Sequence, residues 1–281
     1  MRPPDNVDAE VAAGFGDEWT RFDQSALSAA DKKRIFDEYF HIFPWETLDP
    51  ASMGADFGCG SGRWASLVAP RVGRLYCIDA SAAALAVSRR NLSAYENCEF
   101  INASIDAAPL AADSLDFGYS LGVLHHMPDT AAGLASCVKL LKPGAPFLVY
   151  LYYDFDNKPQ IYRWMWRASE AIRFLVSRSP YWLRYWVSQV FAAVVYWPLA
   201  RAARLFAAMN VPVENWPLNY YRDKPFYVMR TDALDRFGTR LEQRFSRAAI
   251  LHMMTGAGLD QVRFSERTPH WCAVGVKRQA G

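Results

Sequence analysis

The chain has 281 residues, of which 52% are hydrophobic and 15% aromatic, and its net charge is only +2. This composition excludes an intrinsically disordered protein and supplies enough apolar surface for one large domain or a core domain with an insertion. Because the near-neutral charge gives no overall basic field, we expect no nucleic-acid partner.

Residues 51–155 alternate short β-type runs with Ala-rich helical runs. The expected strands are Met53–Phe57, Arg74–Ile78, Glu99–Asn102, Asp116–Ser120 and Pro146–Tyr152. The expected helices are Trp64–Arg71, Ala82–Leu92 and Thr130–Leu141, and Ser81 is placed to cap the second of them. Strands that alternate with helices predict βαβ units and a parallel sheet covered on both faces.

The C-terminal part returns to this alternation after a long helical segment. We expect a helix over Ser246–Ala257, with Ser246 as its cap and Gly258 just past its end. Two strands follow, Gln261–Ser265 and Trp271–Val276, and the short link between them allows a hairpin.

The cysteines are odd in number and scattered: Cys59, Cys77, Cys98, Cys137 and Cys272. Without a CxxC pair we expect neither a disulfide framework nor a bound metal, and reduced thiols indicate a cytoplasmic protein. The first residues contain no apolar stretch of the kind that forms a secretory signal.

Three glycines at alternate positions follow the first expected strand, in MGADFGCGSGRW. At Gly58, Gly60 and Gly62 the backbone can turn sharply, because no Cβ stands in the way. A ligand can then lie against the main chain at the positive end of the following helix. A plain glycine-rich turn is the simpler alternative.

An acid ends the second expected strand, at Asp79 in RLYCID. A carboxylate at this position can accept hydrogen bonds from two ribose hydroxyls. A helix-capping or surface aspartate is the alternative, but an acid that follows such a loop favours a cofactor containing adenosine. Nicotinamide cofactors call for GxGxxG, whereas this loop has GxGxG.

The acid Asp56 followed by GxGxG resembles motif I of the class I, Rossmann-like methyltransferases that use S-adenosylmethionine, and in particular their type 11/12 members. LGVLHH and LLKPGAPFLVYLYY resemble later segments of the same family. The resemblance covers residues 51–155 well and 246–277 more loosely. It implies an α/β fold with a doubly wound, mostly parallel seven-stranded sheet, a C-terminal antiparallel hairpin and a helical insertion or cap.

This resemblance implies S-adenosylmethionine as the cofactor and S-adenosylhomocysteine as the product. The cofactor-binding residues that it implies are Asp56, Gly58, Cys59, Gly60, Gly62, Asp79, Ala80, Ser104, Ile105, Leu121 and Gly122. Ser104 stands where many relatives carry an aspartate for the adenine amino group, and Asp106 is close enough in sequence to replace it.

A base is needed only if the acceptor atom carries a proton that does not leave spontaneously. His125 and His126 are the best-placed candidates because they follow a central strand, and Asp154 follows the next strand. Ordinary packing, backbone capping or loop formation would also explain these residues. His252 and the group Tyr220, Tyr221 and Asp223 are weaker candidates, and the group is also expected to contact substrate.

The first fifty residues are rich in aromatic and acidic side chains, with a helix-like stretch near Asp31–Phe43. In many relatives an N-terminal helix folds over the cofactor as a lid. Phe15, Trp19, Phe22 and Tyr39 are the side chains that would exclude water, and Trp19 is also a candidate substrate contact. Simple packing against the core explains them equally well.

The segment Pro159–Asn210 contains seven arginines, five tryptophans and a single acid, Glu170. Ile161, Trp164, Met165, Ala168, Ile172 and Leu175 recur at helical spacing. We expect Pro180 and Pro198 to divide the segment into three helices, and Tyr185–Ala200 to be too short and too polar to span a membrane. A cap over an apolar substrate pocket, a contact with anionic lipid and a dimer interface all remain open.

The expected organisation is an N-terminal helical lid over 1–50, a cofactor-binding core over 51–155, a helical insertion over 156–215, and a substrate-side loop with the rest of the sheet over 216–281. The expected function is methyl transfer to oxygen, nitrogen or carbon of a small or lipid-linked acceptor. The location would be cytoplasmic, with peripheral contact at the inner membrane face. A nicotinamide-dependent oxidoreductase and a non-catalytic cofactor-binding module are the alternatives.

Overall fold

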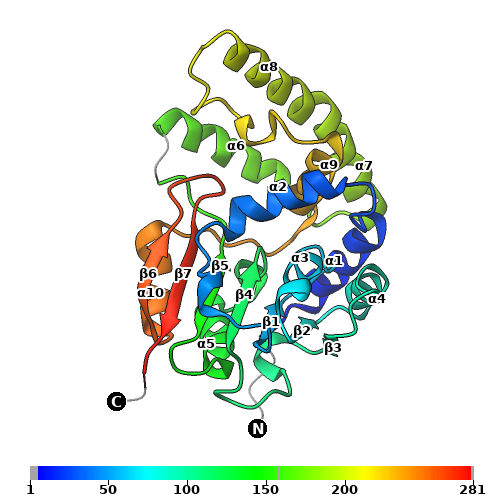
Figure 1. Ribbon diagram of the computed structural model, residues 1–281. Helices are drawn as coiled ribbons and strands as arrows, with labels where there is room; N and C mark the ends of the chain where they lie inside the picture. Colours follow the sequence, from blue (N-terminus) through cyan, green and yellow to red (C-terminus); the bar gives the residue numbers. More distant parts are fainter. Residues whose placement is uncertain (1–5, 157–158, 280–281) are drawn as a thin grey trace. The chain divides into compact units, whose positions relative to one another are not determined.

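The computed structural model describes residues 6–156 and 159–279. The chain forms two compact units (Figure 1). To the first belong the described residues of Met1–Gln24, Lys32–Asp154 and Leu241–Gly281. The second contains those of Ser25–Asp31 and Phe155–Arg240, so it extends beyond the end expected for the insertion.

The first unit is built on a seven-stranded sheet with the order β3-β2-β1-β4-β5-β7-β6 (Figure 1). The strands are β1 Met53–Phe57, β2 Arg74–Asp79, β3 Cys98–Asn102, β4 Phe117–Leu121, β5 Pro146–Tyr150, β6 Leu259–Phe264 and β7 Cys272–Lys277. The pairs among β1–β5 are parallel, and β7 runs antiparallel to β5 and to β6. The predicted fold class and its C-terminal hairpin are confirmed.

Helices cover both faces of this sheet. They are α1 Ala9–Arg21, α2 Ala29–Phe40, α3 Ala65–Val68, α4 Ala82–Asn91, α5 Thr130–Leu140 and α10 Arg247–Gly256. Two predicted caps are confirmed, since the Ser81 and Ser246 side chains accept hydrogen bonds from the backbone of Ala84 and Ala249. Gly258, just past α10, has φ +97°, in the region that favours glycine.

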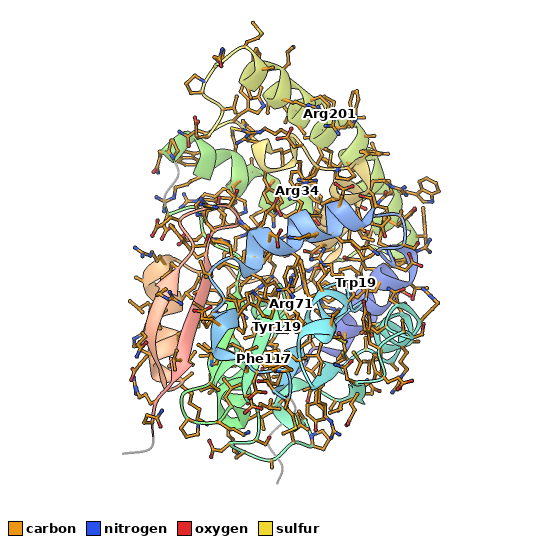
Figure 2. All side chains as sticks on the ribbon, viewed as in Figure 1. Trp19, Arg34, Arg71, Phe117, Tyr119 and Arg201 are labelled. Carbon is orange, nitrogen blue, oxygen red and sulfur yellow. The ribbon has the colours of Figure 1, made fainter. Side chains whose placement is uncertain are left out.

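The two faces of the sheet bury different kinds of side chain. Phe57 and Phe147 share an aliphatic-rich core with residues of α5 and α10. On β4, Phe117 and Tyr119 contact an aromatic cluster instead, where the ring of Tyr119 lies 5.2 Å from that of Phe40 (Figure 2). Alternate residues of a strand point to opposite faces, and a Cβ on Gly118, between these two, would lie 3.0 Å from Phe57 in the first core.

The second unit is helical. Its helices are α6 Gln160–Val176, α7 Tyr181–Phe191, a π-helical turn at Ala192–Tyr196, α8 Trp197–Ala208 and α9 Phe226–Gly238. Pro180 precedes α7, as expected, but the predicted break at Pro198 is wrong. The chain is helical without interruption over Tyr181–Ala208. The π turn just before Pro198 absorbs the missing backbone donor and the bulk of the ring.

This continuous helix corrects a second expectation. Among the described residues, Tyr181–Ala208 is the one helix long and apolar enough to cross a membrane by length and composition. The sequence-based estimate was too short because it ended the apolar stretch at Ala200. Only 22% of the apolar window is buried.

Candidate cofactor and acceptor site

The glycine loop lies at the carboxyl end of β1. Gly58, Gly60 and Gly62 all have positive φ, of +82°, +53° and +76°. The backbone amides of Gly58 and Cys59 both donate to the carbonyl of Ile78, at 2.8 and 3.0 Å. A Cβ at Gly58 would lie 2.4 Å from the side chain of Val123. Sterics and backbone conformation therefore both require glycine here.

The carboxylate of Asp79 holds this loop in place. Its Oδ2 accepts a hydrogen bond from the Gly60 amide at 2.9 Å, and its Oδ1 accepts one from the Ser81 amide at 2.8 Å. Burial raises the pKa of Asp79, while these two backbone donors act in the opposite direction. Each carboxylate oxygen has a second lone pair, so the group can still accept from ribose hydroxyls.

Asp56 is fully buried on β1, and neither of its carboxyl oxygens has a hydrogen-bond partner. The hydroxyls of Ser61 and Tyr119 are also buried without one. Burial raises the pKa of Asp56 to about 8; Asp79 adds to this shift, and Tyr119 and Arg63 oppose it. Buried polar groups normally have partners, so these three fit a ligand that brings its own donors and acceptors.

The residues predicted for the adenine lie together after β3. Ile105 is buried, whereas Ser104 is partly exposed. Asp106 is exposed, and its carboxylate accepts a hydrogen bond from the backbone amide of Asn6 at 3.1 Å. Asp106, which was expected to replace the aspartate of relatives, therefore already accepts a hydrogen bond from the N-terminal segment.

Other predicted cofactor residues border the same loop. Cys59 is buried, Ala80 is exposed after β2, and Leu121 is buried at the end of β4. Gly122 has φ +79°, and a Cβ built on it would meet nothing within 4 Å. Open space at a left-handed glycine beside the loop leaves room for a ligand. All five cysteines are free and buried.

Helix α1 packs directly over the glycine loop and α4. A Cβ at Gly60 would lie 2.7 Å from Nε1 of Trp19, and one at Gly16 would lie 2.5 Å from Oγ of Ser81. The four aromatic residues that were predicted to form the N-terminal lid thus divide into two groups. Trp19 lies on the loop and Phe15 contacts His126, whereas Phe22 and Tyr39 are core residues.

His125 and His126 lie in the short turn Leu124–His126 after β4. His125 is fully buried, neither ring nitrogen has a hydrogen-bond partner, and its ring lies 3.9 Å from that of Tyr152. Burial, together with the nearby His126 and Arg244, lowers the pKa of His125 well below its usual value. The ring is therefore neutral at physiological pH and can accept a proton.

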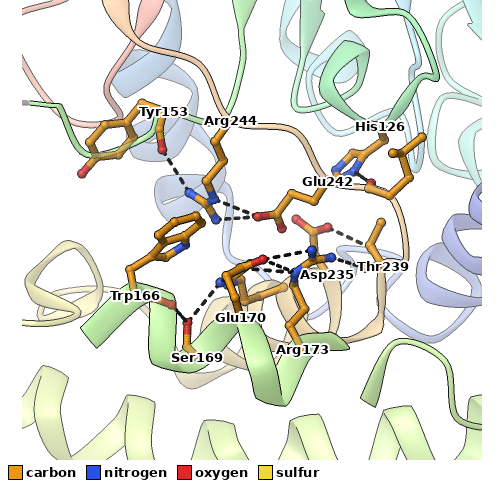
Figure 3. Close-up of polar contacts among 12 residues, drawn as sticks. His126, Tyr153, Trp166, Ser169, Glu170, Arg173, Asp235, Thr239, Glu242 and Arg244 are labelled. Carbon is orange, nitrogen blue, oxygen red and sulfur yellow. Dashed lines mark hydrogen bonds and ion pairs between the residues drawn. The ribbon is translucent and has the colours of Figure 1, made fainter. Parts of the chain in front are cut away.

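His126 has a defined tautomer. Its Nδ1 lies 2.7 Å from the carbonyl oxygen of Leu241 (Figure 3). A carbonyl only accepts, so Nδ1 carries the proton and the lone pair of the neutral ring is at Nε2. Gln243 holds the same turn in place, because its backbone amide donates to the carbonyl of His125 at 3.0 Å.

An ion pair that the sequence analysis missed lies in the segment that supports these histidines. Arg244 bonds to Glu242 at 2.8 Å and to the carbonyl of Tyr153 at 3.2 Å (Figure 3). Its guanidinium lies 5.1 Å from the centre of the Tyr152 ring. The alternation of Glu242 and Arg244 in TRLEQRF was the available signal, because residues two apart in an extended chain share a face.

The remaining candidates lie elsewhere. Asp154 ends the first unit, where its backbone amide donates to Phe245 at 3.2 Å, and His252 is exposed on α10. Tyr220, Tyr221 and Asp223 belong to the second unit. There Tyr221 packs against Tyr196, and Asp223 pairs with Arg222 at 3.0 Å. Their predicted substrate role stays a prediction.

A family model described as a methyltransferase domain matches residues 55–149, which contain the glycine loop, Asp79 and both histidines. The match covers 95 of the 281 residues, so it shows a likeness to the S-adenosylmethionine-dependent methyltransferases for this domain rather than for the whole chain. This likeness favours S-adenosylmethionine as the cofactor over the nicotinamide alternative. Which residues bind the cofactor stays a prediction, supported by the unpartnered polar groups beside the loop.

Curated relatives agree with this family. The chain is 27% identical over 147 residues to the ubiquinone biosynthesis O-methyltransferase of Hahella chejuensis, covering 52% of this chain and 62% of the relative. It is 28% identical over 127 residues to the enzyme of the same name from Stutzerimonas stutzeri, covering 44% and 53%. The chain thus spans less than two thirds of these relatives' lengths.

Solved structures share the fold. A SAM-dependent methyltransferase from Methanosarcina mazei matches with a TM-score of 0.52 at 14% identity, over 85% of this chain and 99% of that one. A chain from the Haloferax volcanii complex with the methyltransferase activator Trm112 matches with the same score and identity, over 95% and 99%. At such low identity these likenesses support the fold alone.

We predict that Asp79→Ala weakens S-adenosylmethionine binding at least about tenfold, because the variant loses the ribose acceptor and the bond that holds Gly60. Isothermal titration calorimetry measures the change. Asp260→Ala, which removes an exposed acid from β6, is the matched control and should bind normally. Equal affinities for the two variants would contradict the ribose assignment.

We predict that Asp56→Asn changes how stability depends on pH. The pKa of Asp56 is raised in the folded state from 3.8 to about 8, so the native chain binds the proton more tightly than the unfolded chain. Wild-type stability should therefore fall relative to the variant by up to about 1.4 kcal/mol per pH unit as the pH rises between these two values. Urea unfolding at several pH values tests this, and parallel curves would refute it.

Proposed function

We propose that this chain is a methyltransferase that transfers a methyl group to a hydroxyl of a small apolar or lipid-linked acceptor, with His125 as the base. The observation that carries the proposal is the neutral, buried imidazole of His125, whose two nitrogens lack partners in the family's cofactor domain. The curated relatives are named O-methyltransferases, which favours oxygen over the nitrogen and carbon acceptors that the sequence also allowed.

The chain's own residues would position the cofactor, exclude water from the site and accept the proton of the acceptor hydroxyl. Bound S-adenosylmethionine supplies a methyl group that is already electrophilic. The glycine loop and Asp79 fix the cofactor, and Trp19, packed on Gly60, restricts access of water to the loop. Alignment and exclusion of water supply most of the rate gain in a displacement of this kind.

His125 would accept the hydroxyl proton at one of its ring nitrogens as the oxygen–methyl bond forms. Tyr152 holds the imidazole by stacking, and Gln243 anchors the backbone of the same turn. The guanidinium of Arg244 over Tyr152 adds a positive charge nearby, which favours an acceptor oxygen that is losing its proton. His126 Nε2 and Asp154 are the second choices for the base.

The aromatic surroundings support an apolar acceptor. Tyr150, Tyr152 and Phe15 lie within ring contact of one another or of the two histidines. Aromatic side chains with a few placed polar groups are typical of sites for small apolar ligands.

We predict that His125→Ala lowers the rate of methyl transfer about a hundredfold or more and leaves S-adenosylmethionine affinity unchanged. The assay follows labelled methyl from the cofactor to nonylcatechol, a phenolic probe with an apolar tail. His252→Ala, which removes an exposed histidine, is the control and should be fully active. Equal rates for the two variants would contradict the role of His125.

The pH profile gives a further test of the same base. Because the pKa of His125 lies well below its usual 6.5, the rate should stay level as the pH falls through 6.5. A loss of activity centred near that value would mean that another group is the base. Cofactor binding without turnover on any acceptor would instead favour the non-catalytic alternative.

A further inference from the structure

Helix α6 presents its apolar side to solvent. Trp164, Met165, Ile172 and Leu175 are exposed, with Trp164 at 59% and Leu175 at 71% of full exposure. These are members of the stripe that the sequence places on one face of a helix, and the side chain of Ile161 lies outside the described residues. An amphipathic helix of a water-soluble domain normally buries such a stripe.

The opposite side of α6 is polar and faces the interior of the second unit. Glu170 forms ion pairs with Arg173 and with Arg236 of α9 (Figure 3). Arg173 also donates to the carbonyl of Thr239 at 3.0 Å, and Arg236 to the hydroxyl of Ser169 at 3.1 Å. These bonds fix the rotation of α6, so its outward apolar face is part of the packed structure.

The continuous helix formed by α7, the π turn and α8 repeats this arrangement. Its inner side buries small residues and one tyrosine, namely Ser188, Ala192, Tyr196, Ala200 and Ala203. Its outer side carries large ones: Trp182, Trp186, Val190, Val194, Trp197, Leu205 and Met209 are exposed, with Trp182 at 63% and Trp186 at 62%. Large side chains outside and small ones inside reverse the usual preference.

We call the exposed apolar residues of α6, α7, the π turn and α8 the outer stripe. Of the large hydrophobic side chains exposed in the described chain, all but Leu251 lie between Trp164 and Phe226. Such concentration of apolar surface in one region marks a contact with a partner or a membrane.

Positive charge lies beside part of the outer stripe. The segment 159–210 has seven arginines and one acid, and that acid is already engaged by Arg173 and Arg236. Among the described residues, exposed Arg167 and Arg178 have no carboxylate partner and lie against the rings of Trp164 and Phe174. Their guanidinium groups can therefore reach phosphate.

We propose that the outer stripe docks on the surface of a membrane that contains anionic phospholipid. Tryptophan beside arginine on an amphipathic helix suits the interface between acyl chains and headgroups. A second copy of the chain is the poorer partner, because a two-fold interface would bring the arginines of both copies together. Anionic headgroups neutralise them instead.

The geometry favours a helix that lies on the membrane over one that crosses it. The inner side of α7 packs on α9, where the rings of Phe191 and Phe237 stack at 4.7 Å. Arg184 and Arg201 donate to backbone carbonyls of Gly238 and Arg222. Crossing the bilayer would break these contacts and place both arginines near hydrocarbon. Docking would bring the enzyme to acceptors dissolved in lipid. This use of docking rests on the proposed function, whereas the membrane contact itself does not.

Vesicle flotation tests this docking without any methyl acceptor. The wild-type chain should float at low salt with vesicles of phosphatidylcholine and phosphatidylglycerol, and much less with phosphatidylcholine alone. Trp182→Ser with Trp186→Ser should reduce binding to the anionic vesicles about tenfold, since two exposed indoles are lost. Leu251→Ser, an exposed apolar change on α10, is the matched control and should float like the wild type.

A second pair of variants tests the charge. Arg167→Glu with Arg178→Glu should abolish flotation, whereas Lys139→Glu with Arg263→Glu, an equal change of charge at exposed positions of the first unit, should retain most of it. Calorimetric binding of S-adenosylmethionine should be unchanged in all four variants. If the wild-type chain did not bind S-adenosylmethionine, the proposed function would be contradicted and the membrane proposal would not.

Three results would overturn the proposal. The first is a wild-type chain that does not associate with anionic vesicles at low salt. The second is a dimer by light scattering that the two tryptophan changes convert to monomer with no vesicle binding in either form, which would assign the stripe to a second copy. The third is binding that resists alkaline carbonate extraction, which would mean that Tyr181–Ala208 crosses the bilayer.

Discussion

The close passage of the backbone at Gly58–Gly62 is the constraint on which the site depends. The loop is bonded to the end of β2 through the carbonyl of Ile78 and to the start of α4 through Asp79. A side chain at Gly58 would collide with Val123, which follows β4. One loop thus sets the spacing of the two central strands and of the helix that follows β2, and it leaves the ligand a surface made of backbone.

Around this loop the chain buries polar groups that its own structure does not satisfy. Asp56, Ser61, Tyr119 and His125 all have buried atoms without hydrogen-bond partners. Each such group destabilises the ligand-free fold, because its hydration is lost without replacement. A ligand that supplies hydrogen bonds to these atoms would recover this cost and would bind more tightly for it.

The second unit differs from the first in which side chains it buries and which it exposes. Its interior is held by small side chains against α9 and by the pairs of Glu170 with Arg173 and Arg236. Exposed indoles are unfavourable in water and favourable at a lipid interface, where exposed arginines such as Arg167 and Arg178 could also bind phosphate. The exposed apolar side chains of the second unit therefore fit the membrane surface that we propose as its partner.

The sequence by itself determined the sheet, the loop and the caps, because period-two runs, alternating glycines and Ser81 or Ser246 act over a few residues. It identified the stripe of α6 from its period, yet not its direction. That direction depends on Arg236, far along the chain, and only tertiary packing decides such contacts. The continuity of the helix through Pro198 had the same origin, since a π turn can absorb a proline. Likewise, Glu242 and Arg244 lie near the histidines only because folding brings the segment 241–245 beside the turn that follows β4.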